Sequence, residues 1–138
     1  MSGLQAIEKL LETPELKLKK PADTRWLSYD SACQTLVKVF PAVCASLSRE
    51  AEERGDALAV GLRNVVRKYN FIASLYMMCD ILPTVTRLSC TLQASCIEVS
   101  QLHLLVTSTI EALELLCTSK GPRSNTLDFD LQNSQVVK

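Results

Sequence analysis

The fold class is decided by residues 56–79, whose sequence is DALAVGLRNVVRKYNFIASLYMMC. Apolar side chains recur along it at alternating steps of four and three residues, which is the period of one face of an α-helix. They are Leu58, Leu62, Val65, Tyr69, Ile72, Tyr76 and Cys79. Gly55 and Asp56 are typical of a helix end followed by a new N-cap. We therefore predict one helix of about six turns that packs against a partner helix.

The same helical period continues on both sides of this segment. Before it, a helix is predicted from an N-cap at Ser28 to the charged run that ends at Arg54. After it, apolar residues continue to Gln93, and a last helix ends near Lys120, where Lys-Gly-Pro forms a stop signal. A short amphipathic helix is also predicted over residues 2–13, followed by a basic linker or brief strand. The sequence thus predicts an all-α fold, an irregular bundle of about five to six helices.

Two prolines fall inside the long predicted helices. Pro41 cannot donate a hydrogen bond to Val37, so its helix either kinks there or breaks into two. The apolar phase runs unbroken across Pro41, which favours a kink. Pro83 likewise bends or breaks the helix that contains it.

The chain is predicted to consist of a helical domain and a tail. Residues 1–121 form the helical domain, because the helical periods end at the Lys-Gly-Pro stop. Residues 122–138 are polar with isolated apolar side chains, and we expect them to be mostly disordered.

Bulk composition excludes several classes of function. Lys+Arg and Asp+Glu number 15 each among 138 residues, so no global positive field attracts nucleic acid or anionic lipid. No signal sequence or apolar run of about 20 residues is visible, so we expect an intracellular, soluble protein without membrane contact. The six cysteines form no C-x-x-C pair and lie in apolar stripes, which indicates reduced core residues. We predict no metal and no cofactor.

No catalytic constellation is visible either. Metal-assisted hydrolysis needs converging carboxylates, but Asp30 fits the first turn of a helix and Asp80 a solvent-facing position near a helix end. A Cys-His nucleophile would need His103, which lies beside Leu102 and is expected to be a partly buried packing residue. Phosphate-binding, serine-hydrolase and zinc-protease motifs are missing. We predict no catalytic residues and no enzyme activity.

Two basic groupings are candidates for phosphate contacts. Lys19 and Lys20 lie in the linker, and Arg63 and Arg67 lie one turn apart on a helix. The alternative is a solvated face opposite the apolar stripe, which the neutral charge of the chain favours.

Trp26 is the only tryptophan, and it lies where the basic linker meets the first long helix. Its indole could fill the core or lie exposed as a platform on which a base stacks. Arg25 could stack on that indole or hold a phosphate, and both alternatives stay open.

Several blocks, taken in order along the chain, resemble the hAT superfamily of DNA transposases, and most of all the vertebrate zinc-finger proteins derived from it. They are residues 23–32 with the Arg-Trp-Leu-Ser motif, Leu36, Leu47, residues 71–75 and residues 80–83 through 88–89. In that superfamily an all-helical insertion domain interrupts an RNase H-like catalytic core, and the Arg-Trp motif belongs to the insertion. The resemblance spans about residues 4–117 and implies a piece of the insertion domain, with the catalytic acids outside it.

The resemblance also implies a role for the Arg-Trp pair. Trp26 matches the tryptophan that stacks on a flipped base at the transposon end, and Arg25 matches its partner. We therefore expect a non-catalytic, nuclear fragment with residual DNA binding through these residues and the nearby lysines. The alternative is a protein-interaction or dimerisation module without a nucleic-acid role. In it, the stripe from Leu58 to Cys79 docks on another helical protein or on a second copy of the chain.

Overall fold

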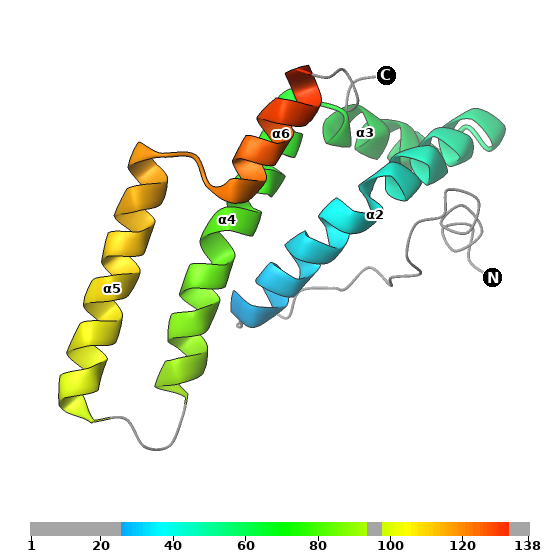
Figure 1. Ribbon diagram of the computed structural model, residues 1–138. Helices are drawn as coiled ribbons and strands as arrows, with labels where there is room; N and C mark the ends of the chain where they lie inside the picture. Colours follow the sequence, from blue (N-terminus) through cyan, green and yellow to red (C-terminus); the bar gives the residue numbers. More distant parts are fainter. Residues whose placement is uncertain (1–25, 94–97, 133–138) are drawn as a thin grey trace.

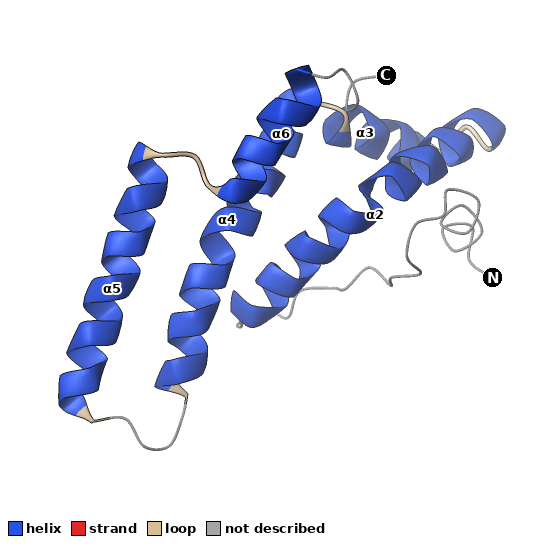
Figure 2. Ribbon diagram, in the orientation of Figure 1, coloured by secondary structure: helices blue, strands red, loops and turns tan. Residues whose placement is uncertain are grey.

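The fold was analysed on a computed structural model that describes residues 26–93 and 98–132. These residues form helices and short connections without any strand (Figure 2), so the all-α prediction is confirmed. The helices are α2 (Trp26–Glu53), α3 (Ala57–Val66), α4 (Tyr69–Leu92), α5 (Val99–Thr118) and α6 (Pro122–Gln132). Outside the described residues lie the predicted N-terminal helix and linker, with Lys19, Lys20 and Arg25.

α4 is the helix around which the others are arranged (Figure 1). It packs against α2, α3, α5 and α6, whereas α5 packs against α4 alone among the described helices. α5 runs antiparallel to α4, and α6 continues in the same general direction as α5 along the first half of α4. The core is small and lies mainly between α2 and α4. Its buried side chains include Val39, Ala42, Ile72, Leu75, Cys79 and Leu82.

The turn between α2 and α3 follows the predicted signals. Gly55 adopts a φ of 61°, the left-handed conformation that closes a helix. The Asp56 side chain accepts a hydrogen bond from the backbone N–H of Leu58 at 3.1 Å, as an N-cap residue does. α2 begins at Trp26, so Ser28 lies inside the helix and its prediction as the N-cap is wrong.

The prediction of one continuous helix from Asp56 to Cys79 is wrong, because the chain breaks at Arg67–Lys68. Lys68 is extended, with a φ of −72° and a ψ of 135°, and starts α4 in a new direction. Neither glycine nor proline marks the break, so packing overrides the local preference for helix. In the new direction Phe71 stacks on Phe40 of α2, with ring centroids 6.4 Å apart.

Neither proline breaks its helix, since α2 continues through Pro41 and α4 through Pro83. A proline at position 83 leaves the carbonyl of Cys79 without its usual helical N–H partner. Gln34 of α2 replaces that partner, because its Nε2 donates to the Cys79 carbonyl oxygen at 3.1 Å. The defect that Pro83 creates in α4 therefore becomes a bond between α2 and α4.

The prediction that the tail is disordered is wrong for Pro122–Gln132, which forms α6. Pro122 is suited to the first helical position, where the missing N–H is not needed. Leu127 packs inward and is only 3% exposed. α6 has little amphipathic pattern of its own, so contacts with distant residues stabilise it rather than its local sequence.

Candidate protein-interaction surface

Among the predicted nucleic-acid-binding residues that the structure describes, Trp26 lies far from Arg67. Trp26 is the first residue of α2. Arg67 follows α3, and its charge acts on Cys44 in the second half of α2. Trp26 and Cys44 are separated by about 27 Å along the helix axis, at a rise of about 1.5 Å per residue. Lys19, Lys20 and Arg25 precede the described part of the chain.

Arg63 and Arg67 differ in their contacts and exposure. Arg63 Nη1 lies 3.5 Å from Glu52 Oε1, so this guanidinium ties α3 to α2. Arg67 is exposed at the C-terminal cap of α3. Burial raises the pKa of the Cys44 thiol, and the Arg67 charge offsets part of the rise. The two arginines therefore have different surroundings, since Arg63 pairs with Glu52 and Arg67 lies exposed.

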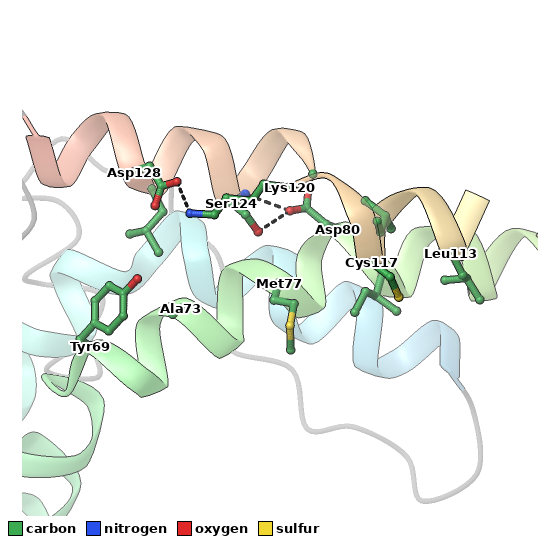
Figure 3. Close-up of a pocket in the computed structure, with 13 residues that line it drawn as sticks. Tyr69, Ala73, Met77, Asp80, Leu113, Cys117, Lys120, Ser124 and Asp128 are labelled. Atoms are coloured by element: carbon green, nitrogen blue, oxygen red, sulfur yellow. Dashed lines mark hydrogen bonds and ion pairs between the residues drawn. The ribbon is translucent and has the colours of Figure 1, made fainter. Parts of the chain in front are cut away.

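A cavity of about 510 Å³ lies where α4, α5 and α6 meet (Figure 3). Its wall is mostly apolar, and its apolar side chains come from α4, α5 and α6. They are Ala73, Met77, Ile81, Leu113, Leu116, Cys117 and Leu127. Polar groups line the part nearest α6, where Lys120 forms an ion pair with Asp128. Such a combination of apolar wall and few polar groups is typical of a binding pocket.

Asp80 of α4 caps the N-terminus of α6 from a distant part of the sequence. Its Oδ1 accepts from the backbone N–H of Arg123 at 2.8 Å. Its Oδ2 accepts from the backbone N–H of Ser124 at 2.9 Å and from the Ser124 hydroxyl at 2.7 Å. An N-cap residue normally supplies these bonds, but Gly121 at that position has no side chain. Asp80 is half-buried, so the prediction that it faces solvent is wrong.

Gly121 is needed because the Asp80 carboxyl occupies the space beside it. A Cβ atom built on Gly121 would overlap that carboxyl, so even alanine cannot be accommodated without movement. A second contact fixes α6, since Arg123 Nη2 donates to Gln34 Oε1 at 3.2 Å. Gln34 in turn donates to the Cys79 carbonyl, so one glutamine connects α2, α4 and α6.

α5 is the least covered helix of the described chain. Its 20 residues include no buried side chain, although most of them are apolar. One side packs against α4, with half-buried Leu102, Leu105, Thr109, Ala112 and Leu116. Five large apolar residues on its remaining surface are exposed. They are Val99, Leu104, Val106, Ile110 and Leu115, with exposed fractions from 36% to 84%.

A second helical stripe runs along α5 beside the one that contacts α4. Its members follow one another at steps of four and three residues and are Val99, His103, Val106, Ile110, Leu113 and Cys117. We call this set the α5 stripe. Its last two members, Leu113 and Cys117, line the cavity, so the stripe leads into it (Figure 3). His103 is exposed, and its prediction as a partly buried packing residue is wrong.

Metal ligands and reactive thiols can be sought among the titratable groups of the described residues. No three His, Cys, Asp or Glu side chains there are grouped so as to hold a metal ion. The five described cysteines are free thiols. Burial raises the pKa of Cys33, and raises that of Cys79 to about 11, which suppresses the reactive thiolate.

Two stretches are long and apolar enough to cross a membrane when judged by length and composition alone. They are Tyr69–Leu92 and Val99–Gln132. Core helices of soluble proteins can also satisfy this criterion, and α4 carries four of the buried core residues. The criterion therefore gives only weak support for membrane insertion.

Comparison with known protein families, curated proteins and solved structures finds no match to this chain. The apolar surface of α5 and the adjoining cavity are therefore identified by burial and by the residues that line the cavity. Periodicity predicted α5, but it did not show that α5 lies uncovered. Pro122, the first residue of α6, fits the start of a helix, and that signal could have identified α6.

Proposed function

We propose that this chain is a non-catalytic helical module that binds another protein through α5. The observation that carries the proposal is a helix of 20 mostly apolar residues without one buried side chain. Exposed apolar surface of this extent marks interaction sites in soluble proteins. Fully burying one side chain of the size of Ile110 contributes about 1.5–3 kcal/mol, so several such residues can hold a partner.

A second exposed apolar surface lies on α3, and it competes with α5 for this role. It contains Leu58, Leu62 and Val65, the first half of the stripe from which we predicted an interaction surface. The second half of that stripe is core, since Ile72 and Cys79 are buried. α3 has only 10 residues and packs against both α2 and α4. α5 is twice as long and, among the helices that the structure describes, packs against α4 alone.

The test compares matched substitutions on the two surfaces. Ile110 is 50% exposed and Leu62 is 45% exposed, so Ile110→Ser and Leu62→Ser remove similar apolar area. We expect Ile110→Ser to reduce the binding of a hydrophobic dye and any concentration-dependent sedimentation, and Leu62→Ser to change both much less. Absence of dye binding together with strictly monomeric sedimentation of the unsubstituted chain would contradict the proposal.

A nucleic-acid role is the second candidate, and it rests on the Arg-Trp motif. We propose that the chain derives from a hAT transposase insertion domain and that Arg25 and Trp26 retain affinity for unpaired bases. The start of α2 at Trp26 supports this, because the positive end of a helix favours a nearby phosphate. Trp26 fluorescence should be quenched by hairpin DNA at low salt, and Trp26→Ala should weaken that binding. Salt-insensitive or undetectable binding would overturn the nucleic-acid role alone.

A further inference from the structure

We propose that the α5 stripe and the cavity at its end receive a basic amphipathic helix of a partner protein. The inference rests on the proposed function and names the partner's chemistry. Three observations carry it: the helical period of the stripe, the cavity into which the stripe leads, and the sign of the charges beside it.

The stripe has the geometry that a second helix requires. Val99, Val106 and Ile110 are exposed members at helical spacing, and they lie on one side of α5 next to the side that contacts α4. A helix that carries apolar stripes on two adjacent sides is suited to lie between two other helices. α4 covers one of these sides, and the partner helix covers the other.

The cavity supplies a place for an anchoring side chain. Met77 of α4 and Leu113 and Cys117 of α5 line it, and α6 closes the end away from the stripe (Figure 3). Its volume of about 510 Å³ falls within the range of ligand pockets and holds a large apolar side chain. Interfaces of the helix-in-groove kind gain much of their affinity from one or two such anchors.

The charges select a basic partner. α5 contains Glu111 and Glu114 and neither lysine nor arginine. Both glutamates are exposed, and the helical period places them on the side of the stripe away from α4. Residues 81–119 contain one cation, Arg87, and three carboxylates, Glu98, Glu111 and Glu114. Their net charge is therefore −2. The Lys120 ammonium does not change this, because Asp128 pairs with it.

A second copy of the chain fits the α5 stripe less well than a basic helix does, because of the same charges. Its α5 would bring another pair of glutamates and no cation to the interface. Like charges across an interface weaken binding, whereas a lysine-rich helix complements Glu111 and Glu114. The experiment must therefore distinguish self-association through α5 from the binding of a basic partner helix.

The experiment measures binding of two labelled peptides to the full chain by fluorescence anisotropy. One is an amphipathic helix of leucine and lysine, about five turns long, and the other replaces every lysine with glutamate. We expect the lysine peptide to bind at least about tenfold more tightly at low salt, with a difference that shrinks as salt is added. Equal affinities, or tighter binding of the glutamate peptide, would overturn the inference.

Charge reversal tests the role of the α5 carboxylates. Glu114→Lys should weaken the lysine peptide about fivefold and strengthen the glutamate peptide, whereas Glu53→Lys on α2 should leave both nearly unchanged. Circular dichroism checks that both variants keep the helical content of the unsubstituted chain. An equal effect of the two variants would contradict the assignment to α5.

Ile110→Ser separates failure of the inference from failure of the proposed function. If it weakens both peptides and neither is preferred, α5 is the binding surface but the basic partner is wrong. If it weakens neither, or no more than Leu62→Ser does, the proposed function itself fails. A chain that sediments as a dimer and becomes monomeric with Ile110→Ser would show that a second copy covers α5, which overturns the inference.

Discussion

α4 and α5 are both long apolar helices, yet one forms the core and the other lies uncovered. α4 buries Ile72, Leu75, Cys79 and Leu82, whereas α5 buries no side chain. The cause is the number of neighbours, because among the described helices four pack against α4 and only α4 packs against α5. Apolar periodicity therefore predicts a helix, but its burial depends on which other elements reach it.

The largest expected difference between the two helices is the loss of free energy of unfolding when a leucine is replaced by alanine. Leu82 of α4 is 3% exposed and Leu104 of α5 is 69% exposed. Leu82→Ala should lower the free energy of unfolding by about 2–5 kcal/mol, since it leaves a cavity in the core. Leu104→Ala should change it by no more than about 0.5 kcal/mol. Urea denaturation followed by circular dichroism measures both, and similar losses would show that α5 is buried in solution.

The buried thiol of Cys79 should react more slowly than the exposed thiol of Cys117. Cys79 is buried with a pKa of about 11, whereas Cys117 on α5 is exposed. At pH 8 only about one Cys79 thiol in a thousand is ionised, and the rate of alkylation rises with pH until the thiolate dominates. Iodoacetamide labelling resolved by mass spectrometry should modify Cys117 first. Equal rates for Cys79 and Cys117 would contradict the burial of Cys79.

Removing the long-range cap should release α6 without unfolding the core. Asp80→Ala deletes the acceptor of the Arg123 and Ser124 amides, which should cost about 1–2 kcal/mol of α6 stability. Hydrogen exchange should accelerate across α6 and stay slow at Ile72. Asp128→Ala is the control, because it removes only an exposed ion pair worth about 1 kcal/mol or less. Unchanged exchange in α6 of Asp80→Ala would show that the cap is dispensable.

The smallest effect expected is the coupling between Gln34 and Pro83. Gln34→Ala leaves the Cys79 carbonyl without its donor, which should cost about 1 kcal/mol or somewhat more. In a Pro83→Ala background the alanine N–H can bond that carbonyl, so the same substitution should cost less by about 0.5–1 kcal/mol. A double-mutant cycle from urea denaturation measures the difference. Strict additivity would show that Gln34 does not compensate for Pro83.

Local signals in the sequence predicted the elements that local chemistry controls. Gly55 and Asp56 marked the turn after α2, and the end of α5 before Gly121 was also predicted. The break at Arg67–Lys68 was missed because no local residue causes it. Pro122 is a local signal for the start of α6, but the cap of this helix comes from Asp80, more than 40 residues earlier, and could not be predicted.

The candidate surface on α5 could be predicted only in part, because its exposure depends on contacts with distant residues. The members of the α5 stripe were visible as apolar residues, but whether a helix covers them depends on the whole arrangement. The stripe from Leu58 to Cys79 shows this most clearly, because Leu58 is exposed and Cys79 is buried. The placement of Lys19, Lys20 and Arg25, as candidate DNA contacts, stays a prediction.

The most direct test of the account is the affinity of the leucine-lysine peptide for two variants, Ile110→Ser and Leu62→Ser. The residues have similar exposure but lie on α5 and α3, so only their position distinguishes them. We predict a loss of about tenfold or more for Ile110→Ser and little change for Leu62→Ser. Equal losses, or a larger loss for Leu62→Ser, would contradict the claim that α5 is the interaction surface.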